Sequence, residues 1–373
     1  MNPVALISNA EAQQARKVLL INVTRIGDTV LATPAIRAIA AHFPNARLTC
    51  LGHADRIEVL QNLPYVAKTG AITKRSAPLR GWMDTLRGPE YDYAFVWRND
   101  AALLRYALRK ARHVIAARQG TKVDSRLYAA VDMPRQSSMH AVAWHLALTD
   151  AVGIPRAGLA LDVRVTPAEL GAARSRLDAL FPSGGRPLIG LQVASFPTKR
   201  YRDWPIAHFE ALMRRVLYSH PDSRFVLFGG AADRERIAPL LAIFPGKAAG
   251  VAGALSLRQT LAVMHHTDAY VGVDTGPTHL YGALRKPMVA LYHPALPSAL
   301  FRPLGHPALH AIDHPAAGPS AGPDIAIGEI PVDTVAEALG DALAGRPSRW
   351  PGLPAPGIDP GATPYPGDPG QKV

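Results

Sequence analysis

Short apolar runs alternate with amphipathic stretches along the chain. Residues 17–23 (KVLLINV) form a continuous apolar run, which is typical of a strand buried on both faces of a parallel sheet. After a short loop at 24–28, apolar residues recur at helical spacing up to Phe43. The same criteria predict further strands over 47–51, 93–97 and 113–116, and a helix over 140–152. This alternation is typical of βαβ units.

The pattern starts again after the turn-rich stretch 181–187 (FPSGGRP), with a strand over 188–193. Strands are expected over 224–228, 269–273 and 288–292, and helices over 206–218, 233–243, 257–265 and 277–284. We therefore predict an α/β protein with two Rossmann-like, doubly wound domains, residues 1–165 and 187–345, joined by a linker region, 166–186. Residues 346–373 are dominated by Pro and Gly, so we expect a disordered tail.

Ligands of doubly wound sheets bind where the strand-to-helix loops converge, at the carboxyl ends of the strands. Four loops qualify, at 24–28, 194–204, 229–231 and 274–279. They contain residues suited to a nucleotide or a reacting hydroxyl, namely Gly27 and Asp28; Lys199, Arg200 and Arg202; Gly229 and Gly230; and Asp274, Thr275, Gly276, Thr278 and His279. A helix start with free N–H groups, flanking hydroxyls and cations binds phosphate well.

Each loop also has a purely structural interpretation. Asp28 can be an acidic residue in a first helical turn, and Asp274 or Thr275 a helix N-cap. The cations can be solvent-facing charge, and the glycine pair after the strand 224–228 is a weak signal because it is not a GxGxxG sequence. Taken singly, none of the four loops decides the function.

Charge adds a hint about partners. The net charge is +12, and +9 of it falls in residues 1–150. Such a surface attracts phosphates, anionic lipid or nucleic acid. The candidates for this basic surface are Lys74, Arg75, Arg80, Arg98, Arg118 and Lys122.

Cysteine usage and hydropathy indicate the compartment. A single cysteine, Cys50, excludes an internal disulfide and fits a reducing cytosol. No apolar run reaches the roughly 18–20 residues of a membrane span, and the first residues lack the pattern of a signal peptide. We expect a cytoplasmic protein, with peripheral contact to the inner face of the cytoplasmic membrane.

Several catalytic motifs are missing from the sequence. It contains no Walker A or HExxH sequence. It also contains no Asp-x-Asp, so paired carboxylates that bridge a divalent ion to a diphosphate are not expected. His265, His266 and Asp268 can be drawn as a metal cluster, but adjacent helical side chains point apart. We expect neither a metal nor a cofactor.

Two segments, RIGDTVLATPAIRAIAAHFPNA (25–46) and VGVDTGPTHLYGALRKPMVALY (271–292), resemble the most diagnostic segments of glycosyltransferase family 9, the ADP-heptose:lipopolysaccharide heptosyltransferases. The stretches at 140–155 and 197–212 and the lead-in at 254–276 also resemble that family. The resemblance covers roughly residues 16–345, in order. Jointly these motifs are much more specific than any one of them.

The resemblance implies a GT-B fold, with two Rossmann-like domains facing across a cleft. It implies an inverting, metal-independent enzyme that transfers heptose from ADP-L-glycero-D-manno-heptose to a lipopolysaccharide core acceptor. Asp28 would be the general base on the acceptor hydroxyl. The donor would bind to the second domain at the 199–202 cations, the glycine pair and the 274–279 motif. An anionic glycolipid or glycan acceptor would bind to the first domain, with Arg25, Gly27, Arg98 and Arg118.

Three departures from the family pattern keep alternatives open. Residues 293–297 read HPALP where the family has a Gly-Pro-Thr/Ser-Asp-Pro turn, which favours a relative that uses another nucleotide sugar for capsule, O-antigen or another glycan. Arg98-Asn99 replace a Gln-Gly pair, and alignment on Trp204-Pro205 makes Arg202 the phosphate cation, with Lys199 as the alternative. A non-catalytic nucleotide-binding paralogue is disfavoured because Asp28 and Asp274 are both present. We expect a monomer that does not bind nucleic acid.

Overall fold

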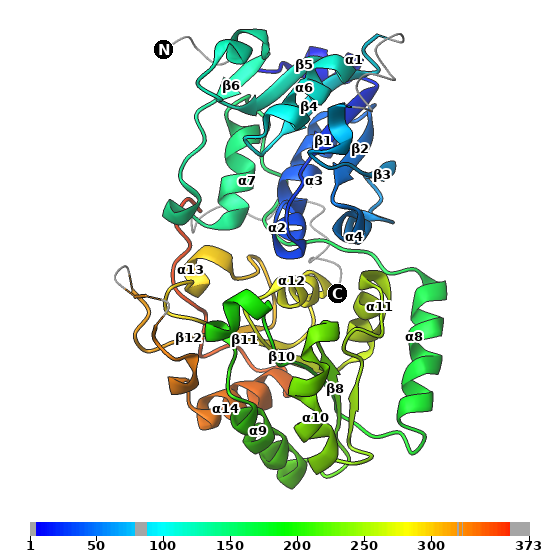
Figure 1. Ribbon diagram of the computed structural model, residues 1–373, viewed down its shortest axis with the longest axis vertical. Coiled ribbons are helices and arrows are strands. Elements are labelled where there is room, and N and C mark those ends of the chain that lie inside the picture. Colours follow the sequence, from blue (N-terminus) through cyan, green and yellow to red (C-terminus); the bar gives the residue numbers. More distant parts are fainter. Residues whose placement is uncertain (1–4, 79–87, 319–320, 323, 359–373) are drawn as a thin grey trace. The chain divides into compact units, whose positions relative to one another are not determined.

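The computed structural model describes residues 5–78, 88–318, 321–322 and 324–358. The chain divides into two compact units: an N-terminal unit, Met1–Arg164 with Pro356–Val373, and a C-terminal unit, Val165–Ala355. Each unit contains one six-stranded sheet whose strands all pair in parallel, with helices on both faces (Figure 1). The prediction of two doubly wound α/β domains is confirmed.

The N-terminal unit orders its strands β3-β2-β1-β4-β5-β6, the Rossmann order. Its strands are β1 (Lys17–Ile21), β2 (Arg47–Gly52), β3 (Lys68–Ala71), β4 (Tyr91–Val96), β5 (Ala111–Ala117) and β6 (Ala129–Val131). Its helices are α1 (Asn9–Gln14), α2 (Ile26–Leu31), α3 (Thr33–His42), α4 (Ala54–Ile57), α6 (Ala101–Lys110) and α7 (Ala141–Asp150), with 3-10 turns η1 (Glu58–Leu60), η3 (Lys122–Arg126) and η4 (Gln136–Ser138).

The C-terminal unit repeats this topology, in the order β12-β11-β10-β7-β8-β9. Its strands are β7 (Leu188–Gln192), β8 (Arg224–Phe228), β9 (Ala248–Gly250), β10 (Ala269–Val273), β11 (Met288–Tyr292) and β12 (Leu309–Asp313). Its helices are α8 (Pro167–Leu180), α9 (Ile206–Ser219), α10 (Arg234–Ile243), α11 (Leu257–His266), α12 (Gly276–Leu284), α13 (Ser298–Phe301) and α14 (Val332–Leu343), with 3-10 turns η5 (Pro197–Arg202), η6 (Ala231–Asp233) and η7 (Ile327–Glu329).

The strands predicted from sequence are the central ones. In β1, Leu19 and Ile21 are completely buried, as are Leu191 in β7 and Val271 in β10, because helices cover both faces of each sheet. The four strands that the apolar pattern misses, β3, β6, β9 and β12, form the four edges of the two sheets. Three of them, β3, β6 and β9, have only three or four residues. The apolar pattern of β12 (LHAID) is interrupted by His310 and ends in Asp313.

The segment predicted as a linker, 166–186, is mostly a helix of the C-terminal unit. Thr166 caps α8 in a capping box with Glu169. Arg258 of α11 pairs with Glu169, with 2.6 Å between Nη2 and Oε2, and this hydrogen-bonded guanidinium lowers the pKa of Glu169 to about 2. The ion pair fastens α8 to α11, so α8 belongs to the packed unit.

The start of the tail is ordered, which corrects the prediction of disorder for residues 346–358. Arg346 and Arg349 both pair with Asp341 of α14, and Trp350 packs against the core of the C-terminal unit. The carbonyl of Trp350 accepts a hydrogen bond of 2.8 Å from the backbone N–H of Ala311, on the open edge of β12. The tail thus supplies the partner that this edge lacks. Residues 359–373 lie outside the described residues.

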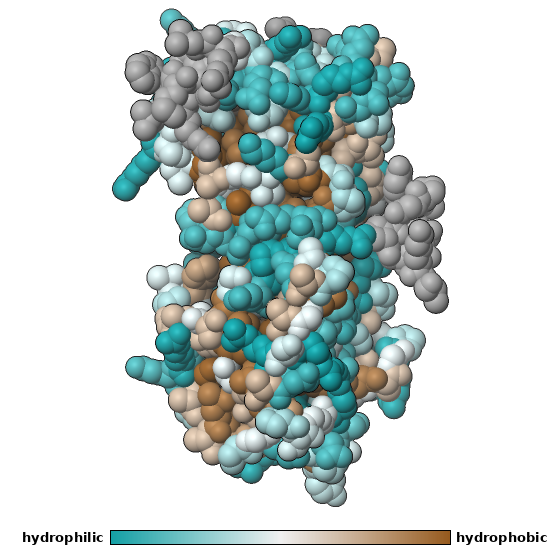
Figure 2. Space-filling model, turned by 90° about the vertical axis from the view of Figure 1, so that its right-hand side faces the viewer, coloured by the Kyte–Doolittle hydropathy of each residue, from teal (hydrophilic) through white to brown (hydrophobic). Residues whose placement is uncertain are grey.

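Hydrophilic residues cover most of the face shown in Figure 2, with smaller hydrophobic areas between them. Large exposed apolar side chains are scattered along the chain, and single ones are ordinary on protein surfaces. Across the described ranges, no helix combines the length and apolar character that spanning a membrane requires.

If the tail is docked as described, Trp350→Ala should destabilise the C-terminal unit by about 1–2 kcal/mol, since a half-buried tryptophan loses less than a fully buried one. Thermal unfolding should then shift down by roughly 2–8 °C. Leu353→Ala is the matched control, because this side chain lies in the same segment and is 38% exposed. Equal midpoints for wild type and Trp350→Ala would show that the tail does not dock.

Candidate functional site

Strand order reverses at one place in each sheet, between β1 and β4 and between β7 and β10. The loops after these strand pairs diverge to opposite faces, and the space between them is where doubly wound folds bind ligands. The sequence-predicted residues Asp28 and Arg98 follow β1 and β4, and Arg202 and Asp274 follow β7 and β10. Each unit therefore brings two of the candidate loops together at its own reversal point.

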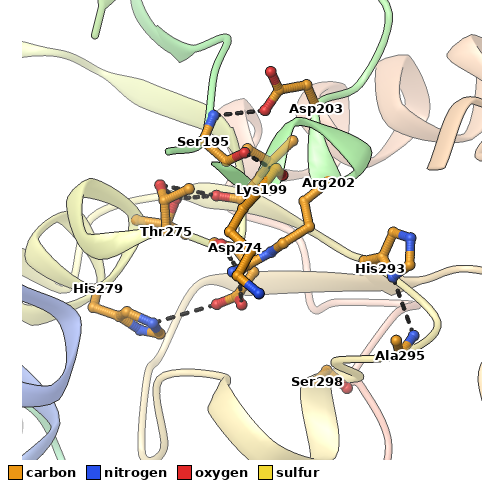
Figure 3. A network of polar contacts seen from close by, with 12 residues as sticks. Ser195, Lys199, Arg202, Asp203, Asp274, Thr275, His279, His293, Ala295 and Ser298 are labelled. Atoms are coloured by element: carbon orange, nitrogen blue, oxygen red, sulfur yellow. Dashed lines mark hydrogen bonds and ion pairs between the residues drawn. The ribbon is translucent and has the colours of Figure 1, made fainter. Parts of the chain in front are cut away.

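In the C-terminal unit, Asp274 is the centre of a polar network (Figure 3). Arg202 donates to both the carbonyl and the Oδ2 of Asp274, and His279 Nε2 lies 3.3 Å from its Oδ1. Burial alone would raise the pKa of Asp274, but the Arg202 guanidinium and His279 outweigh it and the pKa is lowered. Asp274 is thus a buried, charged carboxylate held between two side chains.

The start of α12 carries the other residues of this motif. Thr275 is the N-cap, and Gly276 and Pro277 open the helix. The first N–H groups of a helix have no partner within it, and Pro277 has none to offer, so Gly276 and Thr278 provide them here. His279 is 4% exposed, and its Nδ1 has no hydrogen-bond partner within the described part of the chain. The helix start indicates a site for an anionic ligand, and the unpaired Nδ1, which accepts when Nε2 donates to Asp274, marks a further polar position beside it.

Thr278 does not join this site, which corrects its prediction as a phosphate ligand. Its side chain is completely buried and its hydroxyl donates to the carbonyl of Val273, with 2.6 Å between the oxygens. The Thr275 hydroxyl also donates to that carbonyl, at 3.2 Å. Both hydroxyls tie the start of α12 to the end of β10.

The three cations of the 199–202 loop have different environments. Arg202 is committed to Asp274, and Arg200 lies 3.5 Å from Asp203 and 3.7 Å from Asp233. Lys199 has no ion pair among the described residues, and its Nζ lies 5.6 Å from the centre of the Tyr201 ring. Lys199 is therefore the cation of this loop that stays available to a ligand, a distinction the sequence leaves open.

Asp203, which the sequence analysis does not single out, shapes this loop. Its Oδ1 accepts from the backbone N–H of Ser195 at 2.6 Å, and its Oδ2 lies 3.6 Å from Arg236 Nε. The Ser195 hydroxyl in turn donates to the carbonyl of Lys199, at 2.6 Å. The only sequence signal for Asp203 is its place between the cations and Trp204.

The glycine pair after β8 has a structural explanation. A Cβ at Gly229 would lie 2.9 Å from the Cβ of Asp233, closer than such atoms approach. Asp233 Oδ2 also accepts from the N–H of Gly230, at 2.8 Å. Gly229 is thus required by the tight turn into η6, while Gly230 leaves its backbone on the surface of that turn.

The divergent 293–297 turn is well anchored. His293 Nδ1 accepts from the N–H of Ala295 at 3.1 Å, which places the proton on Nε2, 2.8 Å from the carbonyl of Ile325. Burial lowers the pKa of His293, so it is a neutral residue that fixes the turn. Its ring packs edge-on against Tyr201 at 4.9 Å between centres, joining the turn to the 199–202 loop.

In the N-terminal unit, Asp28 lies in the first turn of α2, where the helix dipole favours a carboxylate. Its Oδ2 accepts from the Thr24 hydroxyl at 2.8 Å. Arg98 Nη2 donates to the same hydroxyl at 2.8 Å and lies 3.7 Å from Asp28 Oδ2. Because 23% of the Asp28 side chain stays exposed, it can meet a reacting hydroxyl.

A fully buried histidine of α7, His145, was missed by the sequence analysis. Burial lowers its pKa to about 4, with Arg98 lowering the pKa further and Asp28 opposing, so His145 is neutral. Its carbonyl accepts from Trp97 Nε1, at 2.9 Å, which fixes the end of β4. Its only sequence signal is a histidine within an apolar helix.

The other predicted acceptor residues have different environments. Gly27 is buried within α2, and Arg25 is the exposed N-cap residue of that helix. Arg118 pairs with Asp132, with 2.6 Å between Nε and Oδ1, at the ends of β5 and β6. Among the residues predicted to form the basic surface, Lys74 pairs with Asp100. Arg80 lies outside the described residues.

The side chains of His266 and Asp268, which with His265 could be drawn as a metal cluster from the sequence, have other partners in the structure. His266 contacts the carbonyl of Leu170, and Asp268 pairs with Arg186. Within the described ranges, no group of three or more His, Cys, Asp and Glu side chains is arranged to hold a metal ion.

Comparison with known proteins is consistent with this architecture. Residues 80–320 match the family model described as "Glycosyltransferase family 9 (heptosyltransferase)". Lipopolysaccharide heptosyltransferase 2 of Salmonella typhimurium is 27% identical over 313 residues, which cover 78% of this chain and 86% of that protein.

Two solved structures show the same fold. E. coli ADP-heptose lps heptosyltransferase II has a TM-score of 0.72 and 22% identity, covering 88% of this chain and 98% of that chain. E. coli heptosyltransferase WaaC with ADP has a TM-score of 0.66 and 17% identity, covering 87% and 99%. With the family model matching more than half of its length, and with two Rossmann-type sheets of the GT-B kind, this chain belongs to glycosyltransferase family 9 and is a glycosyltransferase.

Proposed function

We propose that the protein transfers heptose from ADP-L-glycero-D-manno-heptose to a lipopolysaccharide core acceptor, with inversion and without a metal ion. The observation that carries the proposal is the anion site at the start of α12, where Asp274 is fixed by Arg202 and the His279 Nδ1 is left unpaired. The relatives named for ADP-heptose and lipopolysaccharide support the choice of donor and acceptor.

The diphosphate of the donor binds to the backbone N–H groups at the start of α12 and to Lys199. Departure of ADP leaves negative charge on the diphosphate, and preorganised donors stabilise this charge without reorganising during the reaction. Arg202 acts through Asp274, because its guanidinium is committed to that carboxylate. Gly230 lies on the next loop of the same sheet edge and is proposed to border the nucleotide.

On the acceptor side, Asp28 removes the proton of the attacking hydroxyl. A hydroxyl that displaces ADP in one step attacks opposite to the leaving group, so the configuration of the sugar inverts. One carboxylate is enough for this chemistry, and Thr24 holds it by a hydrogen bond of 2.8 Å.

The acceptor is proposed to be an anionic glycolipid, reached by a cytoplasmic, monomeric enzyme in peripheral contact with the inner membrane face. The support is the charge distribution, with +9 of the net +12 in residues 1–150. Cations near an anionic surface contribute about 1 kcal/mol each and are screened by salt.

A second candidate function is transfer of a different sugar from its nucleotide form. The observation that favours it is the 293–297 turn, which has Ala295 and Leu296 where the family pattern has a hydroxyl and a carboxylate, and which His293 anchors to the backbone. Assays with a panel of nucleotide sugars separate the two candidates.

Asp28→Asn should lower turnover by roughly 10²–10⁴-fold, which is the usual contribution of a general base. The amide retains the shape of the side chain, so ADP affinity and the unfolding midpoint should stay at wild-type values. Steady-state transfer assays and calorimetry with ADP measure the two quantities. Near-wild-type turnover would remove Asp28 from the mechanism.

Lys199→Ala should weaken ADP binding by about 1.5–3 kcal/mol, the contribution of one charge-assisted contact. Adenosine, which lacks the diphosphate, should bind as before. Arg200→Ala is the matched control, since it removes a neighbouring cation that is engaged with Asp203 and Asp233. Calorimetry with ADP, UDP, GDP and adenosine tests this, and tighter UDP or GDP binding would contradict an ADP-sugar donor.

Transfer should continue in excess EDTA, because Lys199 and the start of α12 provide the charge stabilisation that a metal provides elsewhere. The measurement is the initial rate before and after chelation, with and without added Mg²⁺ or Mn²⁺. Loss of activity that either ion restores would show that transfer depends on a metal.

A further inference from the structure

Two departures from the family pattern meet in the C-terminal unit. One lies in η5, where Arg202 is committed to a buried carboxylate and Lys199 is left as the proposed phosphate cation. The other is the 293–297 turn, which begins with His293 where the family pattern has a glycine. The Tyr201 ring contacts both. Its centre lies 4.9 Å from that of the His293 ring and 5.6 Å from Lys199 Nζ.

The backbone of Lys199 is fixed by its own loop. Its N–H donates to the carbonyl of Phe196 at 2.7 Å, and its carbonyl accepts from the Ser195 hydroxyl at 2.6 Å. The chain kinks at Lys199 within η5, where φ is −131° and ψ is 27°. Among the described residues its ammonium forms no ion pair, so the Tyr201 ring is the group that orients it.

An aromatic ring orients an ammonium without neutralising it. The negative face of the Tyr201 ring attracts the charge of Lys199. An ammonium has three N–H donors, and contact with one ring leaves donors for a phosphate. A carboxylate in the same place would pair with the charge, as Asp274 pairs with Arg202. Tyr201 therefore holds Lys199 and leaves its charge to a ligand.

The Tyr201 ring is itself held by His293. The two rings meet edge to face, with an interplanar angle of 77°, which is a favourable geometry for an aromatic pair. The imidazole is fixed through both nitrogens, by the N–H of Ala295 and the carbonyl of Ile325 (Figure 3 shows the contact with Ala295). Burial lowers the pKa of His293, so the ring is neutral and does not repel Lys199. The glycine of the family pattern has no ring, so this support is a feature of this chain's own sequence.

We propose that Tyr201 is a positioning residue for the donor: its ring holds the Lys199 ammonium where it meets the diphosphate, and His293 holds the ring. Identification of the ligand as a nucleoside diphosphate rests on the proposed function, whereas the contacts among the three side chains do not. A lysine that is already oriented loses less conformational entropy on binding. The gain therefore appears as affinity for the diphosphate and not for the nucleoside.

The test measures the binding of ADP and of adenosine to the full-length protein by calorimetry. Tyr201→Leu should weaken ADP binding about two- to fivefold, the contribution of a cation–π contact at a partly exposed site, and leave adenosine unchanged. Tyr201→Phe restores the ring and should regain most of the affinity lost in Tyr201→Leu. Tyr218→Leu is the matched control, because Tyr218 is a tyrosine of α9 that is 93% exposed. An equal loss in Tyr201→Phe and Tyr201→Leu would show that the hydroxyl acts, which overturns the positioning role of the ring.

A double-mutant cycle shows whether Tyr201 acts through Lys199. In the Lys199→Ala background, Tyr201→Leu should have no further effect on ADP binding, because the ammonium that the ring holds is gone. The same loss in the presence and in the absence of Lys199 would overturn the proposal. So would an equal loss for ADP and adenosine, since the ring would then support the whole loop and not the cation.

His293→Asn tests the support of the ring. An asparagine side chain can accept from the N–H two residues further on, here that of Ala295, so this change retains the turn and removes the imidazole. It should weaken ADP binding by a smaller factor than Tyr201→Leu, and have no further effect in the Tyr201→Leu background. ADP binding that His293→Asn leaves unchanged would contradict the role of His293.

Lys199→Ala separates this inference from the proposed function. If Lys199→Ala weakens ADP binding and Tyr201→Leu does not, the positioning role is wrong and the proposed diphosphate site stands. If Lys199→Ala leaves ADP binding unchanged, Lys199 is not the diphosphate cation, and the proposed donor site fails together with the role of Tyr201.

Discussion

A parallel sheet that grows from a central strand in two directions has one place where the chain passes from one half to the other. In both units this place lies beside the first strand, between β1 and β4 and between β7 and β10. The helices after these strands go to opposite faces, so the loops that lead into them separate and leave space for a ligand. The candidate site residues depend on this constraint, because it brings together residues about 70 positions apart in the sequence.

The two reversal points carry the same kind of contact with opposite consequences. Each pairs an aspartate after one strand with an arginine after the other. In the C-terminal unit the pair is buried, with Arg202 held directly against Asp274, so both groups form a rigid part of the site. In the N-terminal unit Arg98 and Asp28 are 3.7 Å apart and partly exposed, with Thr24 between them. The buried pair fixes a binding surface, and the exposed pair leaves a carboxylate accessible to a substrate.

Two segments that the apolar pattern did not assign to the C-terminal unit are held to it by specific contacts. The tail residue Trp350 covers part of the edge of β12, and α8 is fixed to α11 by the Glu169–Arg258 ion pair. Neither feature belongs to the reversal points. Both lie on segments whose composition, rich in Pro and Gly or in charge, carries no strong pattern of its own.

The sequence by itself determined the fold class, the central strands and the positions of the candidate loops. Strands such as β1 and β10 are continuous apolar runs because helices cover both of their faces. Such a run can be recognised from the local sequence alone. The edge strands were decided by tertiary structure, because pairing on one side alone imposes no such pattern. Tertiary structure also decided the order of the tail, because Trp350 pairs with Ala311 of β12, about 40 residues earlier in the sequence.

The roles of individual side chains were decided in the same way. The sequence identified the loops that contain Lys199, Arg202 and Thr278, but not the contacts that these side chains make. Only the folded chain commits Arg202 to Asp274, leaves Lys199 without an ion pair among the described residues, and turns the Thr278 hydroxyl to the Val273 carbonyl. A hydrogen bond depends on distances of a few ångströms between residues far apart in the sequence, so composition and spacing identify candidates and the tertiary structure assigns their partners.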